Sequence, residues 1–193
     1  YVLLIPLLIA LLYTAHPIHT EVVANIKGRD DMLTFFFMVL SFNLLFYFLE
    51  QRKVKILFAS ALAYFACLLT KENAITIIAT IPILVFVFSD VNFKRALRIT
   101  IPFAFVVVVY LLIRNAVLDT VGFGETLDVI NNSLMAAETK SDMFATNFVI
   151  IGKYLALLVF PHPLSFDYSF NQFPIVGWGN LRALGSLLIY IVL

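Results

Sequence analysis

Three short polar clusters interrupt a hydrophobic sequence, and their side chains are the ones with the means to do chemistry. They supply imidazole, carboxylate, guanidinium and ammonium groups, which are costly at the edge of a membrane and are usually retained there for function. In chain order the clusters contain His16, His19 and Glu21; Arg29 and Asp31; and Lys71 and Glu72. We therefore expect them to contact a polar or charged ligand.

The first cluster combines groups that are able to ligate a metal ion. His16, His19 and Glu21 lie close together in the sequence, but Pro17 disturbs regular helical spacing. A structural metal site also needs a fourth ligand and supporting hydrogen bonds, and none is evident. We predict no metal site. Two interpretations stay open: a polar helix end capped by Thr20, or a surface that contacts a substrate.

The second and third clusters provide cations suited to a phosphate group. Arg29 has a planar guanidinium that binds carboxylates or phosphates through paired hydrogen bonds, and Lys71 offers a compact positive charge. Asp31 is equally suited to cap the helix expected to begin near Met32, and to pair with Arg29. Lys71, with Glu72 beside it, also fits a lysine that extends to the membrane surface. Structural and ligand-binding roles are both consistent with these residues.

A fourth candidate is the segment 161–169, in which two prolines stiffen a turn among polar and aromatic residues. Asp167 and Tyr168 are able to hydrogen-bond sugar hydroxyls, but the segment also fits an aromatic anchor at the membrane interface. The sequence contains no phosphate-binding glycine loop, no serine or cysteine nucleophile motif and no His-Glu-x-x-His pair. The chemistry of soluble enzymes is therefore not supported.

The composition predicts an integral membrane protein. Hydrophobic residues make up 62% of the sequence and charged residues 13%, against about a half and a quarter in soluble domains. The mean hydropathy is +1.00. The formal net charge is +1 with no basic stripe, which argues against nucleic acid as a partner. We expect an all-α fold, a polytopic bundle of transmembrane helices in contact with membrane lipids.

The hydrophobic runs predict the helices. Complete transmembrane helices are expected near residues 32–49, 54–69, 73–89 and 97–113, close to the lower limit of about 17–25 residues for crossing a bilayer. Partial or short helices are expected at 1–13, 148–160 and 181–193. Residues 115–147 are expected to form an outer loop that contains an interfacial helix over 126–147. Because the runs reach both ends, we expect residues 1–193 to be one partial transmembrane domain.

Basic residues in two short loops predict the orientation. The loops 50–55 and 90–98 each contain three basic residues, and the positive-inside rule places such loops in the cytoplasm. The three polar clusters and the acid-rich segment 115–147 are then expected on the outer side.

The order of the polar residues resembles a known family. Residues 16–21 read HPIHTE and residues 28–31 read GRDD. This is similar to a motif of the transmembrane O-mannosyltransferases that carry tetratricopeptide repeats, and of their bacterial relatives in the GT-C glycosyltransferase superfamily. Asp31 matches the family aspartate, whereas Asp30 replaces the usual alanine.

Later segments extend the resemblance over most of the chain. Lys71 and Glu72 match a Ser-Lys-Glu motif of the family, with Thr70 in place of serine. Residues 154–160 and 164–169 are similar to a later family segment. On this basis the chain is identified as part of a larger GT-C-like membrane domain.

The resemblance implies a membrane enzyme that passes a mannose-like sugar from a polyprenyl-phosphate carrier to a protein or glycan acceptor on the outer or lumenal side. The family's carboxylate base, which takes the acceptor's proton, lies in a large outer loop expected before residue 1. No cofactor is indicated, and a divalent metal requirement stays open. The soluble repeat region of the family has no counterpart in this sequence. The expected substrate-binding residues are His16, His19, Glu21, Arg29, Asp31, Lys71, Glu72 and Asp167.

Two other classes of function fit parts of the sequence. A transporter or flippase for a lipid-linked substrate would line a polar path with Arg29, Lys71 and Glu72, but transporters usually place such charges near the middle of the membrane. A non-catalytic membrane scaffold explains the hydropathy and leaves the clusters without a use. The composition, rich in Phe, Ile and Asn, favours a bacterial inner membrane, with the endoplasmic reticulum as the alternative.

Overall fold

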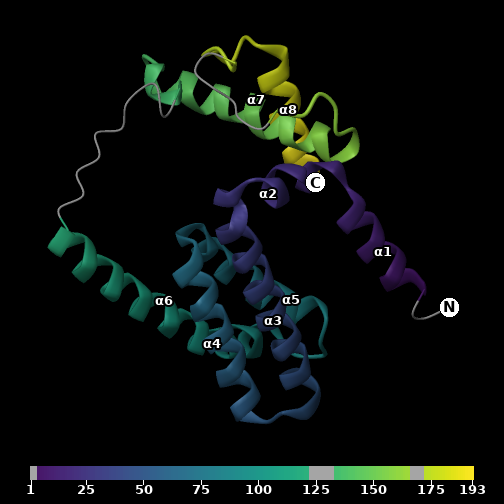
Figure 1. Cartoon of the computed structure of the whole chain (residues 1–193), viewed down its shortest axis with the longest axis vertical. Coiled ribbons are helices and arrows are strands. Elements are labelled where there is room, and N and C mark those ends of the chain that lie inside the picture. Colours follow the sequence, from purple (N-terminus) through teal and green to yellow (C-terminus); the bar gives the residue numbers. More distant parts are fainter. Residues whose placement is uncertain (1–3, 122–132, 166–171) are drawn as a thin grey trace. The chain divides into compact units, whose positions relative to one another are not determined.

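The computed structural model describes residues 4–121, 133–165 and 172–193, which form helices and turns without a strand (Figure 1). The predicted all-α class is therefore confirmed. The chain divides into two compact units. The central unit is Val22–Phe123, and the terminal unit combines Tyr1–Glu21 with Gly124–Leu193.

The central unit is built on an antiparallel hairpin of α3 (Arg29–Gln51) and α4 (Val54–Thr70). The end of α2 (Thr20–Ala24) and the 3₁₀ turn η2 (Ile26–Gly28) precede the hairpin. Arg52 ends α3 in the left-handed conformation, with φ 56°, and its N–H bonds to the carbonyl of Phe48. This cap reverses the chain within a few residues and sets the register of the two helices.

Small polar residues allow α3 and α4 to pack closely. The Ser41 hydroxyl donates to the carbonyl of Ser60 at 2.9 Å, and the Ser60 hydroxyl donates to the carbonyl of Ser41 at 2.7 Å. Both side chains are buried. Small residues let helix backbones approach one another, and the reciprocal hydrogen bonds replace those that water would make.

The remaining elements of the central unit cover the hairpin. They are η3 (Glu72–Ala79), α5 (Thr80–Val87) and α6 (Phe93–Val121). The ring of Phe103 on α6 lies 5.9 Å from that of Tyr64 on α4, and both side chains are fully buried. The core thus lies where α3 and α4 meet α5 and α6.

The expected helix at 73–89 is in fact two elements, the 3₁₀ helix η3 followed by α5. Pro82 lacks an N–H and its ring collides with the carbonyl four residues earlier, which disfavours an α-helix through residue 78. A 3₁₀ helix rises about 2.0 Å per residue, so η3 and α5 together extend roughly 28 Å. That length is comparable to the hydrocarbon core of a bilayer, which is about 30 Å thick.

The terminal unit contains α1 (Leu4–Ala15), η1 (Pro17–His19), η4 (Ser133–Ala136), α7 (Lys140–Val159) and α8 (Leu181–Val192). The segment Pro17–Ala24 bends by 49° from α1. Gly152 on α7 has no space for a side chain, because a Cβ there would lie 1.9 Å from the Ser186 hydroxyl of α8. The Tyr190 hydroxyl of α8 donates to the carbonyl of Ile151 at 3.2 Å. These contacts hold α7 and α8 together.

The expected boundaries near α7 are wrong. The interfacial helix was expected to extend to residue 147 and a short helix to begin at 148, but residues 140–147 are the first turns of α7. Thr139 caps this helix, since its hydroxyl accepts from the N–H of Asp142 at 3.1 Å. The part of the interfacial helix expected over 126–132 lies outside the described residues.

Three helical segments of the described chain are long and apolar enough to cross a membrane. They are Ile26–Gln51, Phe93–Leu118 and Lys140–Val159, and the bent pair Leu4–Ala15 and Pro17–Ala24 makes a fourth if it is one span. The bundle of apolar helices fits the predicted membrane protein.

Candidate functional site

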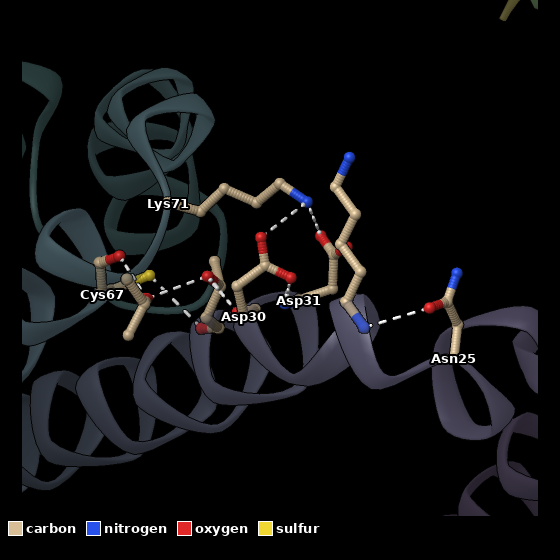
Figure 2. Close-up of polar contacts among 8 residues, drawn as sticks. Asn25, Asp30, Asp31, Cys67 and Lys71 are labelled. Carbon is tan, nitrogen blue, oxygen red and sulfur yellow. Dashed lines mark hydrogen bonds and ion pairs between the residues drawn. The ribbon is translucent and has the colours of Figure 1, made fainter.

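Lys71 lies between two carboxylates at one end of the central unit (Figure 2). Its Nζ is 2.5 Å from Oδ1 of Asp31 and 3.5 Å from Oδ2 of Asp30. The aspartates stand in the first turn of α3 and Lys71 directly follows α4, so the antiparallel hairpin brings them together. The hydrogen bond to Asp31 raises the pKa of Lys71 above its ordinary value, and the charges of both aspartates add to this effect. Lys71 is therefore a fixed cation at neutral pH.

Polar contacts next to the Lys71 ion pairs join the start of α3 to the end of α4. The hydroxyls of Thr34 on α3 and Thr70 on α4 are 2.9 Å apart. Thr70 also donates to the carbonyl of Cys67 at 2.7 Å, and the Cys67 thiol donates to the carbonyl of Thr34 at 3.3 Å. The network couples the start of α3 to the end of α4 and so positions Asp31 against Lys71.

A second ion pair adjoins the first. Arg114 on α6 places Nη2 2.8 Å and Nε 3.1 Å from Oε2 of Glu72. Because Glu72 follows Lys71 in the chain, the two ion pairs lie side by side. We call these five residues the paired-charge cluster: Asp30, Asp31, Lys71, Glu72 and Arg114.

Arg114 is a site residue that the sequence analysis missed. The expected helix ended at 113, whereas α6 continues to Val121. The available signal was a single arginine near the end of a long apolar run, which needs a partner or a route to water. Glu72, itself a predicted member of the third cluster, is that partner.

Arg29 stands beside this cluster but is not part of its ion pairs. Its Nε donates to the carbonyl of Ile26 at 3.2 Å, and the ion pairs found among the described residues do not include it. The side chain is exposed. Arg29 is thus an exposed cation outside the ion pairs of the described residues.

Gly28 fixes the backbone just before Arg29. It is buried, and a Cβ at this position would lie 2.2 Å from the carbonyl oxygen of Val22. No real side chain is compatible with that distance unless the backbone moves. The close approach explains why a glycine precedes the charged start of α3.

The first polar cluster belongs to the terminal unit, and His16 has a structural role there. Its Nδ1 accepts from the N–H of Ile18 at 3.3 Å, which makes it the cap of η1. The proton is then inferred to be on Nε2, which lies 3.1 Å from the carbonyl of Leu158 at the end of α7. Carbonyls in the last turn of a helix lack partners within the helix, so His16 satisfies one of them.

The other residues of this cluster are placed separately. The ring of His19 packs on Tyr13 with the centroids 4.4 Å apart. The Thr20 hydroxyl donates to the carbonyl of Pro17 at 2.7 Å, and Glu21 lies in the first turn of α2. Within the ranges the structure describes, no three His, Cys, Asp or Glu side chains are arranged to hold a metal ion.

The structure therefore brings together the second and third clusters and not all of the expected site. Arg29, Asp31, Lys71 and Glu72 meet at one end of the central unit. His16, His19 and Glu21 belong to the terminal unit. Asp167 lies outside the described residues.

Comparison with known proteins relates the chain to mannosyltransferases. It is 28% identical over 211 residues to "Protein O-mannosyl-transferase tmtc2" of Xenopus laevis, covering 97% of this chain and 25% of that protein. It is 32% identical over 196 residues to "Protein O-mannosyl-transferase F38B6.6" of Caenorhabditis elegans, covering 95% of this chain and 25% of that protein. No family model and no solved structure matches.

Both matches cover only part of the relative's length. The chain spans about a quarter of the length of the curated relatives it matches. Its similarity to proteins named as O-mannosyl-transferases agrees with the resemblance seen in the motifs. Both relatives are animal proteins, so the expected bacterial source gains no support.

Proposed function

We propose that this chain is part of a membrane glycosyltransferase that moves a mannose-like sugar from a polyprenyl-phosphate donor to a protein or glycan acceptor. The observation that carries the proposal is the similarity of nearly the whole chain to two proteins named as O-mannosyl-transferases. The arrangement of charges at one end of the central unit supports it, because transfer at a membrane surface needs polar groups at the helix ends.

Arg29 is the proposed contact for the donor phosphate. Negative charge develops on the leaving phosphate during transfer, and a positioned cation stabilises it. Arg29 is exposed and is not engaged by a carboxylate among the described residues. A guanidinium also matches the geometry of a phosphate better than an ammonium does.

The paired-charge cluster has a different proposed role, which is to hold carboxylates for sugar hydroxyls. The ion pair with Lys71 holds the Asp31 side chain in place, and the ion pair with Arg114 holds Glu72. Ionised carboxylates are strong hydrogen-bond acceptors. His19, Glu21 and Asp167 are further proposed substrate contacts. His16 is proposed to position η1, the 3₁₀ turn that it caps and that contains His19. The catalytic base is proposed to lie outside this sequence.

The proposed location is a membrane of the secretory pathway, with the endoplasmic reticulum taking the place of the bacterial inner membrane. The animal origin of the relatives supports this choice. The paired-charge cluster would then face the lumen, because the basic loops 50–55 and 90–98 would face the cytoplasm.

The test is an assay of polyprenyl phosphate released from a set of polyprenyl-phosphate sugars by the full-length protein in membranes. Arg29→Gln is compared with Arg52→Gln, which removes the same charge at the other end of α3. We expect acceptor-dependent release from at least one donor, a loss of tenfold or more in Arg29→Gln, and activity within twofold of wild type in Arg52→Gln. A tenfold loss corresponds to about 1.4 kcal/mol of transition-state stabilisation.

Two results would overturn the proposal in different ways. If none of the donors is turned over, the chain does not belong to a transferase of this type. If a donor is turned over equally by wild type and both variants, the enzyme class stands and the role of Arg29 is wrong.

A further inference from the structure

The terminal unit contains a pocket between α7 and α8 that has no part in the proposed transfer site. Its volume is about 490 Å³. Small and apolar residues form most of its wall, and two cations, Lys153 and Arg182, complete it. None of the residues that line it carries a carboxylate.

Lys153 is in an unusual place for a charge. It lies well inside α7, a helix long and apolar enough to cross a membrane. An ionisable residue inside such a helix is expensive and by default indicates a function. Arg182 enters the same pocket from the first turn of α8. The ion pairs of the described ranges involve neither residue, so two cationic residues outside those ion pairs line one pocket.

The rest of the lining determines the kind of anion. Gly185 leaves room along the backbone of α8, where a Cβ would meet no atom within 4 Å, while Val149, Ala156 and Ile189 add apolar surface. A small hydrated ion gains little binding free energy from apolar lining residues. A ligand with both an anionic group and a hydrocarbon chain contacts the cations and the apolar residues together. A basic pocket between membrane helices is suited to a lipid head group.

We propose that this pocket binds the phosphate of a membrane lipid between Lys153 and Arg182. The hydrocarbon chain lies along the small and apolar residues of α7 and α8. The proposal does not depend on the transferase proposal, because the pocket is lined by none of the residues proposed to contact the sugar donor or the acceptor.

The first test measures lipid retained by the purified full-length protein in detergent, using native mass spectrometry. The probes are dioleoyl phosphatidic acid, a polyprenyl phosphate, dioleoyl phosphatidylcholine and inorganic phosphate. The double variant Lys153→Gln/Arg182→Gln is compared with Lys140→Gln, which removes an exposed charge at the start of the same helix. We expect the double variant to bind the anionic lipids at least tenfold more weakly, and Lys140→Gln to stay within twofold of wild type.

The probes separate the possible sources of the phosphate. Stronger binding of the polyprenyl phosphate supports the proposal and assigns the pocket to a carrier lipid, and equal binding of phosphatidic acid supports a general membrane lipid. Inorganic phosphate that competes as well as either lipid overturns the proposal. So does an unchanged affinity in the double variant, or an equal loss in Lys140→Gln.

A second variant tests the pocket without removing charge. Gly185→Leu adds a side chain at a lining position where a Cβ meets no atom within 4 Å. Gly179→Leu is the matched control, because its Cβ also meets nothing within 4 Å and it does not line the pocket. We expect Gly185→Leu alone to reduce lipid retention by tenfold or more. Equal retention in both variants would show that the lipid does not occupy this space.

Discussion

The two ends of the central unit carry charge in different ways. At one end, where α3 begins and α4 ends, the paired-charge cluster contains all three ion pairs seen among the described residues. At the other end, where α3 ends and α4 and α6 begin, the basic residues form none of these ion pairs. Those residues are Arg52, Lys53, Lys55, Lys94, Arg95 and Arg98.

The difference shows two uses of charge at a membrane surface. Unpaired basic residues need only an aqueous or anionic surface, and their total charge favours the cytoplasmic side. Paired residues need a defined geometry, which the α3–α4 hairpin and α6 provide here. Substitutions should therefore perturb stability more at the paired end than at the basic end.

The largest effect on stability is expected from Gly28→Ala at the paired end. The new Cβ would lie 2.2 Å from the carbonyl oxygen of Val22, and backbone atoms cannot yield as a flexible side chain can. Overpacking of this kind typically costs about 1–3 kcal/mol. Chemical unfolding of the protein in mixed micelles, followed by circular dichroism, measures the change in the free energy of unfolding.

Gly179→Ala is the control for that substitution. A Cβ at Gly179 meets no atom within 4 Å, so we expect a change below about 0.5 kcal/mol. Equal stability of the two variants would mean that η2 shifts freely and does not fix the start of α3.

Hydropathy predicted many of the helices because it identifies the segments that are buried away from water. The expected helix at 54–69 nearly coincides with α4 (Val54–Thr70). The helices that were misjudged are those whose ends are set by local hydrogen bonds. Thr139 begins α7 with a cap, and Pro82 converts the start of a helix into a 3₁₀ segment, and neither effect appears in a hydropathy average.

The sequence predicted several residues of the candidate site but not which of them form ion pairs. The residues Asp31, Lys71 and Glu72 were singled out by their charge in an apolar sequence, and Asp31 and Lys71 form a contact. The pairing of Glu72 with Arg114 depends on how far α6 extends past its hydrophobic run. The hydrophobic run ends before Arg114, so hydropathy alone does not predict that extension.

A smaller effect is expected from Lys71→Gln, which leaves Asp30 and Asp31 without their shared cation. The three side chains are 31–44% exposed, so solvent screens the interaction, and the start of a helix itself favours acidic residues. We expect a loss of about 0.5–1 kcal/mol in the free energy of unfolding. Lys55→Gln, at the opposite end of α4, should change it by no more than about 0.3 kcal/mol. Equal losses in these two variants would contradict the distinction between the ends.

The stability difference between wild type and Lys71→Gln should also depend on pH. The pKa of Lys71 in the folded protein is raised above its ordinary value of 10.5, so its contribution is fully present below pH 10.5 and is lost as the pH rises through the folded pKa. We expect a constant difference from pH 7 to 9 and a decline above pH 10.5. A difference that declines between pH 7 and 9 would show that another group is responsible.

The smallest effect is expected from Arg114→Gln. The side chains of Arg114 and Glu72 are 39% and 60% exposed, and exposed ion pairs contribute about 0–1 kcal/mol. We expect a loss below about 0.5 kcal/mol at low salt, which disappears at about 1 M salt because the Debye length is then about 3 Å. Unfolding of both proteins at low and high salt measures it.

Arg98→Gln is the matched control, since it removes an exposed arginine near the start of α6, at the basic end. Its loss should be near zero, or become a gain at low salt because neighbouring basic residues repel it. If both arginine variants respond to salt with the same sign, then Arg114 behaves as an unpaired surface charge. The contrast between the two ends would then rest on Lys71 and its two aspartates alone, and the carboxylate of Glu72 would have to be positioned by η3.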